Sequence, residues 1–518
     1  MGTATIVVPR TYRAYKWSTG QVRSFAQPPG LWLDTGHFLP PLAPMRQVFP
    51  RPDAEVSSYA HHKWAYFDSA SGTGIQYRKR ITPTFGSPPY NFVLVDGPSG
   101  MEVQVASWDT DWLSGDMAAS TGYALLTWTP TSAVSGQRVW VRAYDQNGEW
   151  IDFIWTVSTS SGTSQFIFVD NVNGSDSNTG TLASPYKTLA GAYGTSGSTT
   201  NNAGAICYLR GSATQYEMPN FGSSYFTIDP TLKPSALLGY PGESVTLDAS
   251  SALIDLVGAD MAVQDISCDN YNDTIANYRL ISVSAERWYV DSVLWNNAGY
   301  GSSGTSVASM VMSGDTSGAN IQYGAMCGCT ELNRRSGNPG NNYAGCALYS
   351  YTDVAVWLNR AYAPGSAVDN VWYLKSNISY GFMWGNYANI NAIYGFGIGQ
   401  APPEPPGICG PNDFLFNIGI GVGQINFPNT GNSSYQFGAS RLGRNSVFGI
   451  PVCNQSSGPG TFRIDSNALQ TPSSLPTGSA ITTDGKNVVA ASGVLNFDGS
   501  LNTTNYPNDL GTVGAQIK

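Results

Sequence analysis

Three carboxylates in the middle of the chain are the side chains best suited to catalysis. They are Asp265, Glu286 and Asp291. Hydrolysis of a glycosidic bond needs two carboxylates roughly 5–10 Å apart. Asp265 and Asp291 are 26 residues apart, and in successive turns of a stacked parallel sheet they would lie about 5 Å from each other. Because most Asp residues in such stacks occupy turns, a structural role is the favoured interpretation.

Aromatic side chains crowd the same region and suggest a second chemistry, the stacking of exposed rings against sugar rings. Asn and Asp residues beside such rings would hydrogen-bond the sugar hydroxyls. The alternative for each ring is a place in the core or between subunits. The candidates for binding a glycan are Trp288, Tyr351, Trp357, Trp372 and Trp384.

Other kinds of site are not expected. All three His precede residue 63, which excludes Ser-His-Asp or Cys-His catalysis within the later part of the chain alone. The seven Cys show no disulfide or zinc spacing and are predicted to be buried thiols. The stretch Asp170–Asp176 could hold Ca²⁺, but a plain turn is the favoured interpretation. No metal and no cofactor is therefore predicted.

The elements that must position these residues are short β-strands. Charged residues make up only 12% of the chain, which favours an all-β fold rich in tight turns. From Ala205 onward, apolar runs recur about every 20–25 residues, the length of one β-helix turn. Strands in such a turn point alternate side chains inward, so Ile, Val, Leu, Cys and buried Asn stack in ladders. A β-propeller, with a longer and more uniform repeat, is the alternative.

Short phrases at both ends of this region carry a family resemblance. The segment FIFVDNVNGSDSNTGTLASPYKTLA (166–190) is similar to the opening of right-handed parallel β-helix proteins of the pectate-lyase-like class. There, a strand, an Asn-Gly-Ser-Asp turn and a short capping helix close the first turn. The phrases PTGSAITTDG (476–485), LNFDGSL (495–501) and NDLGTVGAQ (508–516) resemble closing phrases of bacterial β-helix families, with Thr482 in place of the usual Asp. The resemblance implies a right-handed parallel β-helix over residues 165–518.

A smaller domain is predicted over residues 81–160. Strand-like runs separated by turn residues indicate a β-sandwich, and they cover Tyr90–Val95, Tyr123–Trp128, Val139–Tyr144 and Trp150–Val157. The phrases VDGPSGMEV, LTWTPT and VWVRAYDQNGEW resemble the Ig-like or cadherin-like modules of bacterial and phage surface proteins. Such modules are usually spacers or binding platforms.

Residues 1–80 are predicted to form an extended attachment arm. Pro residues interrupt every periodic pattern, and aromatic residues lie between them. The arm carries ten Lys or Arg against four Asp or Glu, whereas the rest of the chain carries 16 basic and 31 acidic residues. This asymmetry suggests docking onto an acidic partner. A protein partner is favoured, because no nucleic-acid-binding motif appears and the body is acidic.

The whole plan of arm, sandwich and β-helix resembles that of bacteriophage tailspikes and fibres. No signal-peptide pattern and no apolar run long enough to span a membrane is apparent, so synthesis in a host cytoplasm is expected. The resemblance implies a virion protein, normally a homotrimer, that attaches by residues 1–80 and recognises bacterial surface polysaccharide with its β-helix. A structural decoration protein, a polysaccharide depolymerase acting as hydrolase or lyase, and a bacterial polysaccharide-degrading enzyme are the alternatives.

Overall fold

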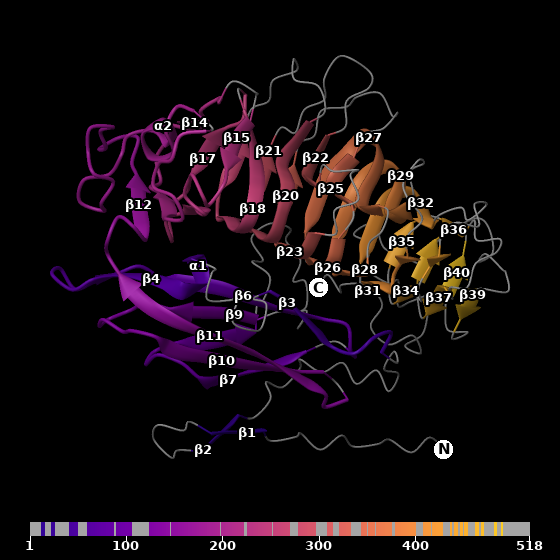
Figure 1. Cartoon of the computed structure of the whole chain (residues 1–518). Helices are drawn as coiled ribbons and strands as arrows, with labels where there is room; N and C mark the ends of the chain where they lie inside the picture. The colour runs from indigo at the N-terminus through magenta and orange to yellow at the C-terminus, as the bar shows by residue number, and fades with distance from the viewer. Residues whose placement is uncertain are drawn as a thin grey trace.

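In the computed structural model, the regular secondary structure of the described residues is almost entirely β-strand, in a long stacked rod and a β-sandwich that lies along one side of it (Figure 1). The structure describes residues 41–49, 60–87, 90–105, 124–145, 147–196, 198–221, 225–250, 252–269 and 278–296, the stretches 12–15 and 22–25, and, with gaps, the strands between 308 and 490. In these parts of the chain, no helix has the length and apolar character needed to cross a membrane. The predicted all-β fold is confirmed.

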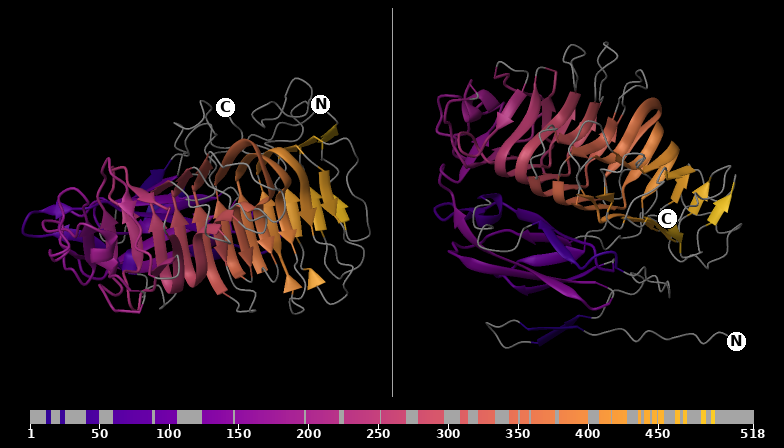
Figure 2. Two further views of the ribbon diagram at one scale, coloured as in Figure 1. Left: turned by 90° about the horizontal axis from the view of Figure 1, so that it is seen from above. Right: turned by 45° about the vertical axis from the view of Figure 1, so that its right-hand side comes forward.

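The rod is a parallel β-helix in which each strand pairs with the equivalent strand of the next turn. Figure 2 shows the strands side by side along its length. The strands of its continuous sheet are β12 (Phe166–Val169), β13 (Ile206–Leu209), β14 (Tyr216–Glu217), β15 (Tyr225–Ile228), β16 (Ala236–Gly239), β17 (Thr246–Asp248), β18 (Leu253–Gln264), β19 (Ser267–Asp269), β20 (Tyr278–Asp291), β21 (Leu294–Asn296), β22 (Ala308–Ser313), β23 (Ile321–Cys327), β24 (Thr330–Leu332), β25 (Tyr343–Tyr349), β26 (Tyr351–Trp357), β27 (Arg360–Lys375), β28 (Ser379–Trp384), β29 (Tyr387–Gly399), β31 (Asn412–Leu415), β32 (Ile418–Phe427), β34 (Ser440–Gly443), β35 (Ser446–Phe448), β36 (Ile450–Cys453), β37 (Phe462–Asp465), β38 (Ala468–Gln470), β39 (Ile481–Thr483) and β40 (Val488–Ala490). A separate parallel pair joins β30 (Ile408–Cys409) and β33 (Gln436–Phe437).

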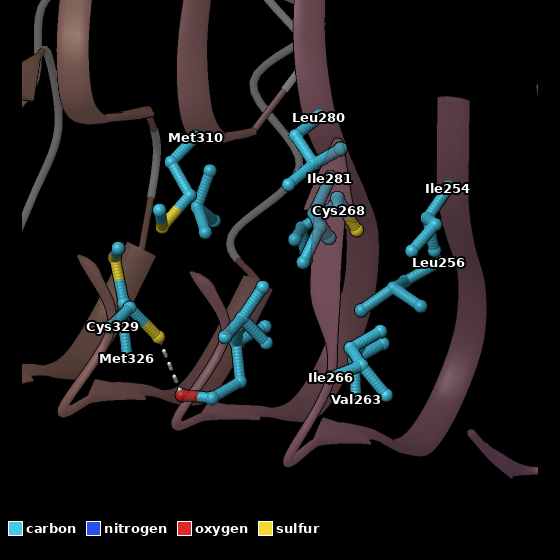
Figure 3. Packing of buried hydrophobic residues seen from close by; sticks show 14 of the residues in the cluster. Ile254, Leu256, Val263, Ile266, Cys268, Leu280, Ile281, Met310, Met326 and Cys329 are labelled. Atoms are coloured by element: carbon cyan, nitrogen blue, oxygen red, sulfur yellow. Dashed lines mark hydrogen bonds between the residues drawn. The ribbon is translucent and has the colours of Figure 1, made fainter. Parts of the chain in front are cut away.

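Alternate side chains of these strands fill the interior of the rod in ladders, as predicted. One ladder runs along the middle of the strands that face the sandwich, and its members are fully buried: Ile167, Cys207, Leu237, Val263, Val290, Met326, Val356 and Met383. Figure 3 shows part of this packing. Each large aliphatic side chain buried in this way contributes roughly 1.5–3 kcal/mol, so the rod is stabilised by repetition along its length.

A ladder of buried Asn side chains also links successive turns. Asn359, Asn386 and Asn417 lie one above another, and each amide group bonds the next. Asn386 Nδ2 donates to Asn417 Oδ1 at 3.0 Å and to the carbonyl of Val356 at 2.9 Å. The amides thereby satisfy backbone groups at a corner where no strand partner exists.

The first turn of the rod closes as the sequence predicts. The Asn-Gly-Ser-Asp turn leads to α2 (Leu189–Tyr193), a short capping helix whose N-cap residue is Thr188. The Thr188 hydroxyl accepts from the amide of Gly191 at 3.0 Å and donates to Asp176 at 2.8 Å. Asp170 also accepts from backbone amides of its own turn. Both carboxylates therefore hold the turn, and the described residues contain no group of three or more side chains suited to a metal ion.

The sandwich consists of two packed sheets. One has the strand order β5 (Thr73–Gly74), β4 (Trp64–Asp68), β11 (Trp150–Ser160), β10 (Gln137–Tyr144) and β7 (Asn91–Asp96). The other has the order β3 (Arg46–Phe49), β6 (Tyr77–Thr84), β9 (Ala124–Trp128) and β8 (Glu102–Val105). The four strands predicted between residues 90 and 157 correspond to β7, β9, β10 and β11.

The sandwich begins earlier in the chain than the predicted boundary at residue 81. Strands β3, β4, β5 and most of β6, together with the one-turn helix α1 (Ala60–Lys63), lie within the predicted arm but are part of the sandwich. The Pro residues that suggested an irregular arm leave room for these short strands between them. Of the segment before residue 41, the structure describes only the hairpin of β1 (Tyr12–Tyr15) and β2 (Val22–Phe25), with β1 beside β7.

Candidate functional site

The face of the rod that meets the sandwich carries its outward side chains in two columns. The first column runs through Phe166, Ile206, Ala236, Ala262, Tyr289, Ala325, Ala355 and Phe382. The second runs through Phe168, Tyr208, Leu238, Gln264, Asp291, Cys327, Trp357 and Trp384. All are buried, and the apolar members share one core with the sandwich. The sandwich therefore covers this face of the rod (Figure 2).

Strand β6 of the sandwich presents two arginines to carboxylates of the rod. Arg78 Nη1 lies 2.7 Å from Asp265 Oδ1, and Arg80 Nε lies 2.5 Å from Asp291 Oδ1. Each of the two also bonds the hydroxyl of Ser292, at 3.3 and 2.9 Å. Asp265 and Ser292 adopt φ angles of 55° and 54°, so the chain bends outward at this corner of each turn and offers these groups to β6.

Asp265 and Asp291 are neighbours, but they are not stacked in register. Gln264, one residue earlier, is the partner of Asp291, and the amide of Asp265 donates to the carbonyl of Asp291 at 3.0 Å. The 26-residue spacing thus predicted the right pair of turns with an error of one residue. The two carboxylates also differ in exposure, since the Asp265 side chain is 25% exposed and that of Asp291 is fully buried.

Their environments push the two carboxyl pKa values in opposite directions. Burial raises the pKa of Asp265 above its ordinary value, against the opposing charge of Arg78. Burial would also raise the pKa of Asp291, but the charges of Arg80 and Arg78 outweigh it and hold that pKa below its ordinary value. Asp291 further accepts from the Tyr289 hydroxyl at 2.7 Å. Asp291 is therefore a buried anion held by the sandwich, with no access to a substrate.

Glu286 lies in a different place from these two residues. It is exposed, and its carboxylate contacts Arg287 Nη1 at 3.1 Å. Arg287 in turn pairs with Asp260 at 2.6 Å, and both residues lie at an earlier bend of their strands than Asp265 and Asp291. The structure therefore brings Asp265 and Asp291 together and leaves Glu286 apart.

The four candidate Trp residues are buried rather than exposed. Trp288 and Trp372 belong to the interior core of the rod, and each has a relative exposure of 0%. Trp357 and Trp384 stack at 5.9 Å under Tyr90 of the sandwich and have exposures of 0% and 2%. A sugar ring cannot reach an indole in these positions. Tyr351 begins β26, and its side chain lies outside the described residues.

A polar cleft of about 180 Å³ opens beside the Arg78–Asp265 pair, between the rod and the sandwich. Its walls combine a tyrosine ring, carboxylates, amides and cations, from Gln76, Arg78 and Lys79 on the sandwich and Tyr240, Glu243, Gln264 and Asp265 on the rod. Gly239 also lines it, and there an added Cβ would lie 2.0 Å from the carbonyl oxygen of Asp265. Only glycine permits this approach of the two backbones.

Arg210 organises the rod side of the cleft. Its guanidinium group lies 4.5 Å from the ring centroid of Tyr240 and 2.6 Å from Glu243 Oε1. Glu243 also accepts from the amide of Gly211 at 2.6 Å. The bonds from Arg210 hold the pKa of Glu243 below its ordinary value. Tyr240 is thus fixed in orientation while remaining partly exposed.

Lys79 gives the sandwich side of the cleft an unusual ammonium group. Its side chain is nearly fully buried, and its Nζ lies 4.9 Å from the ring centroid of Tyr77. Burial lowers the pKa of Lys79 to about 7. Near neutral pH this group can therefore either donate or accept a proton.

Sequence reasoning did not find Tyr240, Glu243 or Arg210. The phrase Gly239–Ser244, GYPGES, carried the available signal, because it places a ring and a carboxylate on one tight turn directly after β16. Residues at strand ends are a frequent place for binding groups. The Arg partner, 33 residues earlier, and the covering sandwich could not be inferred from spacing alone.

Comparison with known proteins gives no family for the chain. No family model matches it, and no curated protein matches it. Among solved structures, it is similar to the crystal structure of a GH136 lacto-N-biosidase from Eubacterium ramulus (a selenomethionine derivative). The sequences are 11% identical, the TM-score is 0.30, and the likeness covers 59% of this chain and 68% of that chain.

Proposed function

We propose that this chain is a bacteriophage virion protein that recognises bacterial surface polysaccharide through the cleft beside Tyr240. The observation that carries the proposal is the composition and setting of the cleft. A partly exposed ring, two carboxylates, two amides and two cations converge on one small volume. Proteins bind both uncharged and charged sugars by stacking an aromatic ring against the CH groups of the sugar and by hydrogen-bonding its hydroxyls with donors and acceptors.

The cleft also has the rigidity that binding requires. Tyr240, Gln264 and Asp265 are anchored to strands of the rod, and Arg78 is anchored to β6. The Arg78–Asp265 and Arg210–Glu243 pairs fix the side chains before a ligand arrives. A site held in place in this way loses little conformational entropy on binding.

The virion role rests on the plan of the sequence. A basic, Pro- and aromatic-rich segment precedes a sandwich and a rigid rod. In this proposal the protein is made in the host cytoplasm, assembles as a homotrimer and attaches to other virion proteins through its N-terminal segment. Tailspike, fibre and decoration protein are the forms that this role could take.

A depolymerase is the second candidate function, and one observation favours it. Asp265 and Glu243 both line the cleft, and their carboxyl pKa values are shifted in opposite directions, upward for Asp265 and downward for Glu243. Glycosidases use a proton-donating carboxylic acid together with an ionised carboxylate. In that case Asp265 would be the acid and Glu243 the anion.

Binding is tested with purified protein and immobilised capsule or lipopolysaccharide from candidate hosts. Tyr240→Ala should weaken binding about tenfold, which corresponds to ~1.4 kcal/mol, because the ring face is lost. Tyr240→Phe keeps the ring and should bind nearly as well as the parent chain. Equal binding by the Ala variant would refute the assignment of the cleft.

Cleavage is tested separately, by looking for shortened polysaccharide after incubation. If the chain is a depolymerase, Asp265→Asn should remove product formation, while Glu286→Gln, which changes an exposed carboxylate outside the cleft, should leave it intact. Retained binding without any shortened product from the parent chain would eliminate the enzyme and keep the binding protein.

A further inference from the structure

Strand β10 and the first part of β11 have a second face, whose side chains do not enter the shared core. On β10, Val139, Val141 and Ala143 point inward and are fully buried. The alternating residues Arg138, Trp140, Arg142 and Tyr144 are partly or fully exposed. On β11, Trp150 and Ile154 are 54% and 43% exposed, and these two are among the most exposed large apolar side chains in the described chain.

These residues form a continuous row of rings and guanidinium groups, which we call the aromatic–arginine row: Arg138, Trp140, Arg142, Trp150 and Tyr144. Arg138 lies 5.2 Å from the ring centroid of Trp140, and Arg142 lies 5.4 Å from it. Arg142 is also 5.2 Å from the ring of Trp150, which contacts Tyr144 at 6.5 Å. Stacking of this kind holds each ring in a fixed orientation.

Carboxylates neutralise both arginines of the row. Arg138 bonds Asp96 at 2.8 Å, and Arg142 bonds Asp152 through two nitrogens, at 2.6 and 2.7 Å. Trp140 Nε1 donates to the same Asp152 at 2.8 Å. The row therefore offers strong donors and acceptors without a net charge.

From this geometry we propose that the aromatic–arginine row is a second binding surface, specific for uncharged glycan chains. The exposed ring of Trp150 and the partly exposed rings of Trp140 and Tyr144 can stack against the CH faces of sugars, and the ion pairs between the rings can exchange hydrogen bonds with hydroxyls. Four residues of strand separate Trp140 from Tyr144, which is about 13 Å. An extended chain, rather than a single sugar, is the ligand that would contact both ends.

The arrangement favours a sugar over a protein partner. A charge pair interrupts the apolar surface between the rings, whereas the core of a protein interface is depleted in charged residues. It also favours a neutral sugar over an acidic one, because Asp96 and Asp152 already occupy the arginines. This surface belongs to the sandwich and does not include any residue of the Tyr240 cleft.

The test is binding of the full chain to an array of uncharged glycans, built from hexoses and N-acetylhexosamines, beside an equal set that contains uronic or sialic acid. Tryptophan fluorescence then gives the affinity for the best neutral oligosaccharide. Trp150→Ala should lower that affinity about tenfold or more, and Trp150→Phe should restore most of it. Thermal unfolding should be nearly unchanged in both variants, since Trp150 is exposed.

Two controls separate this proposal from the cleft. Tyr240→Ala should leave neutral-glycan binding at the aromatic–arginine row intact. The result for the row therefore does not depend on whether the cleft binds a sugar. Thr156→Ala, at an exposed position of the same face, should have little effect. Binding of acidic glycans only, no binding to the neutral set, or unchanged affinity in Trp150→Ala would overturn the proposal.

Discussion

Single carboxylates in this protein take their role from their partners rather than from their position in the sequence. Asp291 is fully buried, and Arg80, Tyr289 and Ser292 surround its oxygens. Asp265 has the same kind of partner in Arg78 but keeps one side toward a cleft. Spacing alone marks both residues as candidate catalysts. In the structure, Asp291 is a buried anion, whereas Asp265 remains accessible from the cleft.

Removal of the Arg80 charge should destabilise the protein strongly. Arg80→Met leaves Asp291 as an uncompensated buried anion, and breaking a buried pair in this way typically costs ~3–5 kcal/mol. Urea unfolding followed by far-UV circular dichroism measures the change. Arg138→Met is the matched control, because its pair with Asp96 is partly exposed, with 46% of the Arg138 side chain accessible, and surface pairs contribute about 0–1 kcal/mol. Similar losses in the two variants would contradict the assigned role of Asp291.

The sequence predicted which side chains lie close together better than it predicted what those side chains do. The spacing of Asp265 and Asp291 placed them in adjacent turns, which is correct. For the four Trp residues the sequence left two interpretations open, glycan binding and a place in the core, and the structure shows the second. What spacing could not show is that a second domain covers the outward side chains.

At the scale of elements, the Asn ladder is the feature that ties successive turns at one corner of the rod. Asn386→Ala should lower the free energy of unfolding by several kcal/mol, because it leaves the amide of Asn359 and the carbonyl of Val356 without their bonds, at ~1–3 kcal/mol each. Asn171→Ala, which removes an exposed bond to Thr214, should cost far less. Chemical unfolding of both variants measures the two losses of unfolding free energy. Equal losses would contradict the stabilising role of the Asn ladder.

Two buried histidines in helix α1 should make the free energy of unfolding depend on pH. Burial lowers the pKa values of His61 and His62 well below 6.5, and the charge of Lys79 lowers both further. The folded protein keeps both rings neutral, while the unfolded chain binds protons below pH ~6.5. The free energy of unfolding should therefore fall as pH drops from 6.5 to 5, by up to ~1.4 kcal/mol per His for each pH unit.

Urea midpoints at pH 6.5, 5.5 and 5.0 measure this slope. In that range Lys79, with a pKa of about 7, is charged in both states and adds little to it. Asp265 acts in the opposite direction, because its raised pKa favours the protonated folded state as pH falls. The charges of Arg78, Arg80 and Asp291 stay constant. The double variant His61→Leu, His62→Leu should show a clearly shallower slope, and an identical slope would refute the account.

Element positions were largely predictable, because apolar periodicity and turn residues determine short strands directly. Strands β13 and β17 lie within the apolar runs AICYL (205–209) and VTLDA (245–249), and β22 and β26 overlap the runs SMVMS (309–313) and VAVWLNRA (354–361). The strands β3 to β6 were missed because Pro residues conceal strands of two to eight residues. Their pairing depends on long-range partners such as β9 and β11, which local sequence does not reveal.

At the scale of the whole molecule, the sandwich and the rod are held together as one unit. Arg78 and Arg80 form ion pairs with the rod at one corner of the covered sheet. At another corner, Arg46 of β3 pairs with Asp353 and lies 3.7 Å from the ring centroid of Tyr380. Between these corners the two parts share an apolar core. Because both walls of the Tyr240 cleft depend on this docking, the proposed binding site exists only in the assembled unit.

The proposed homotrimer has a direct test. Sedimentation equilibrium of the full chain, whose mass is 55.2 kDa, should give about three times that mass at micromolar concentration. The parallel rod leaves other outer faces of its sheet away from the sandwich (Figure 2), and in a homotrimer the three rods could pack through these faces. A mass equal to one chain at all concentrations would rule out this assembly.

The most direct measurement of the central claim is a crystal structure of the full chain soaked with oligosaccharides released from a bacterial surface polysaccharide that it binds. We predict electron density for sugar against Tyr240, bounded by Arg78 on the sandwich and Asp265 on the rod, with the sandwich docked as described. Sugar density elsewhere on the rod with an empty Tyr240 cleft, or a sandwich detached from the rod, would contradict it.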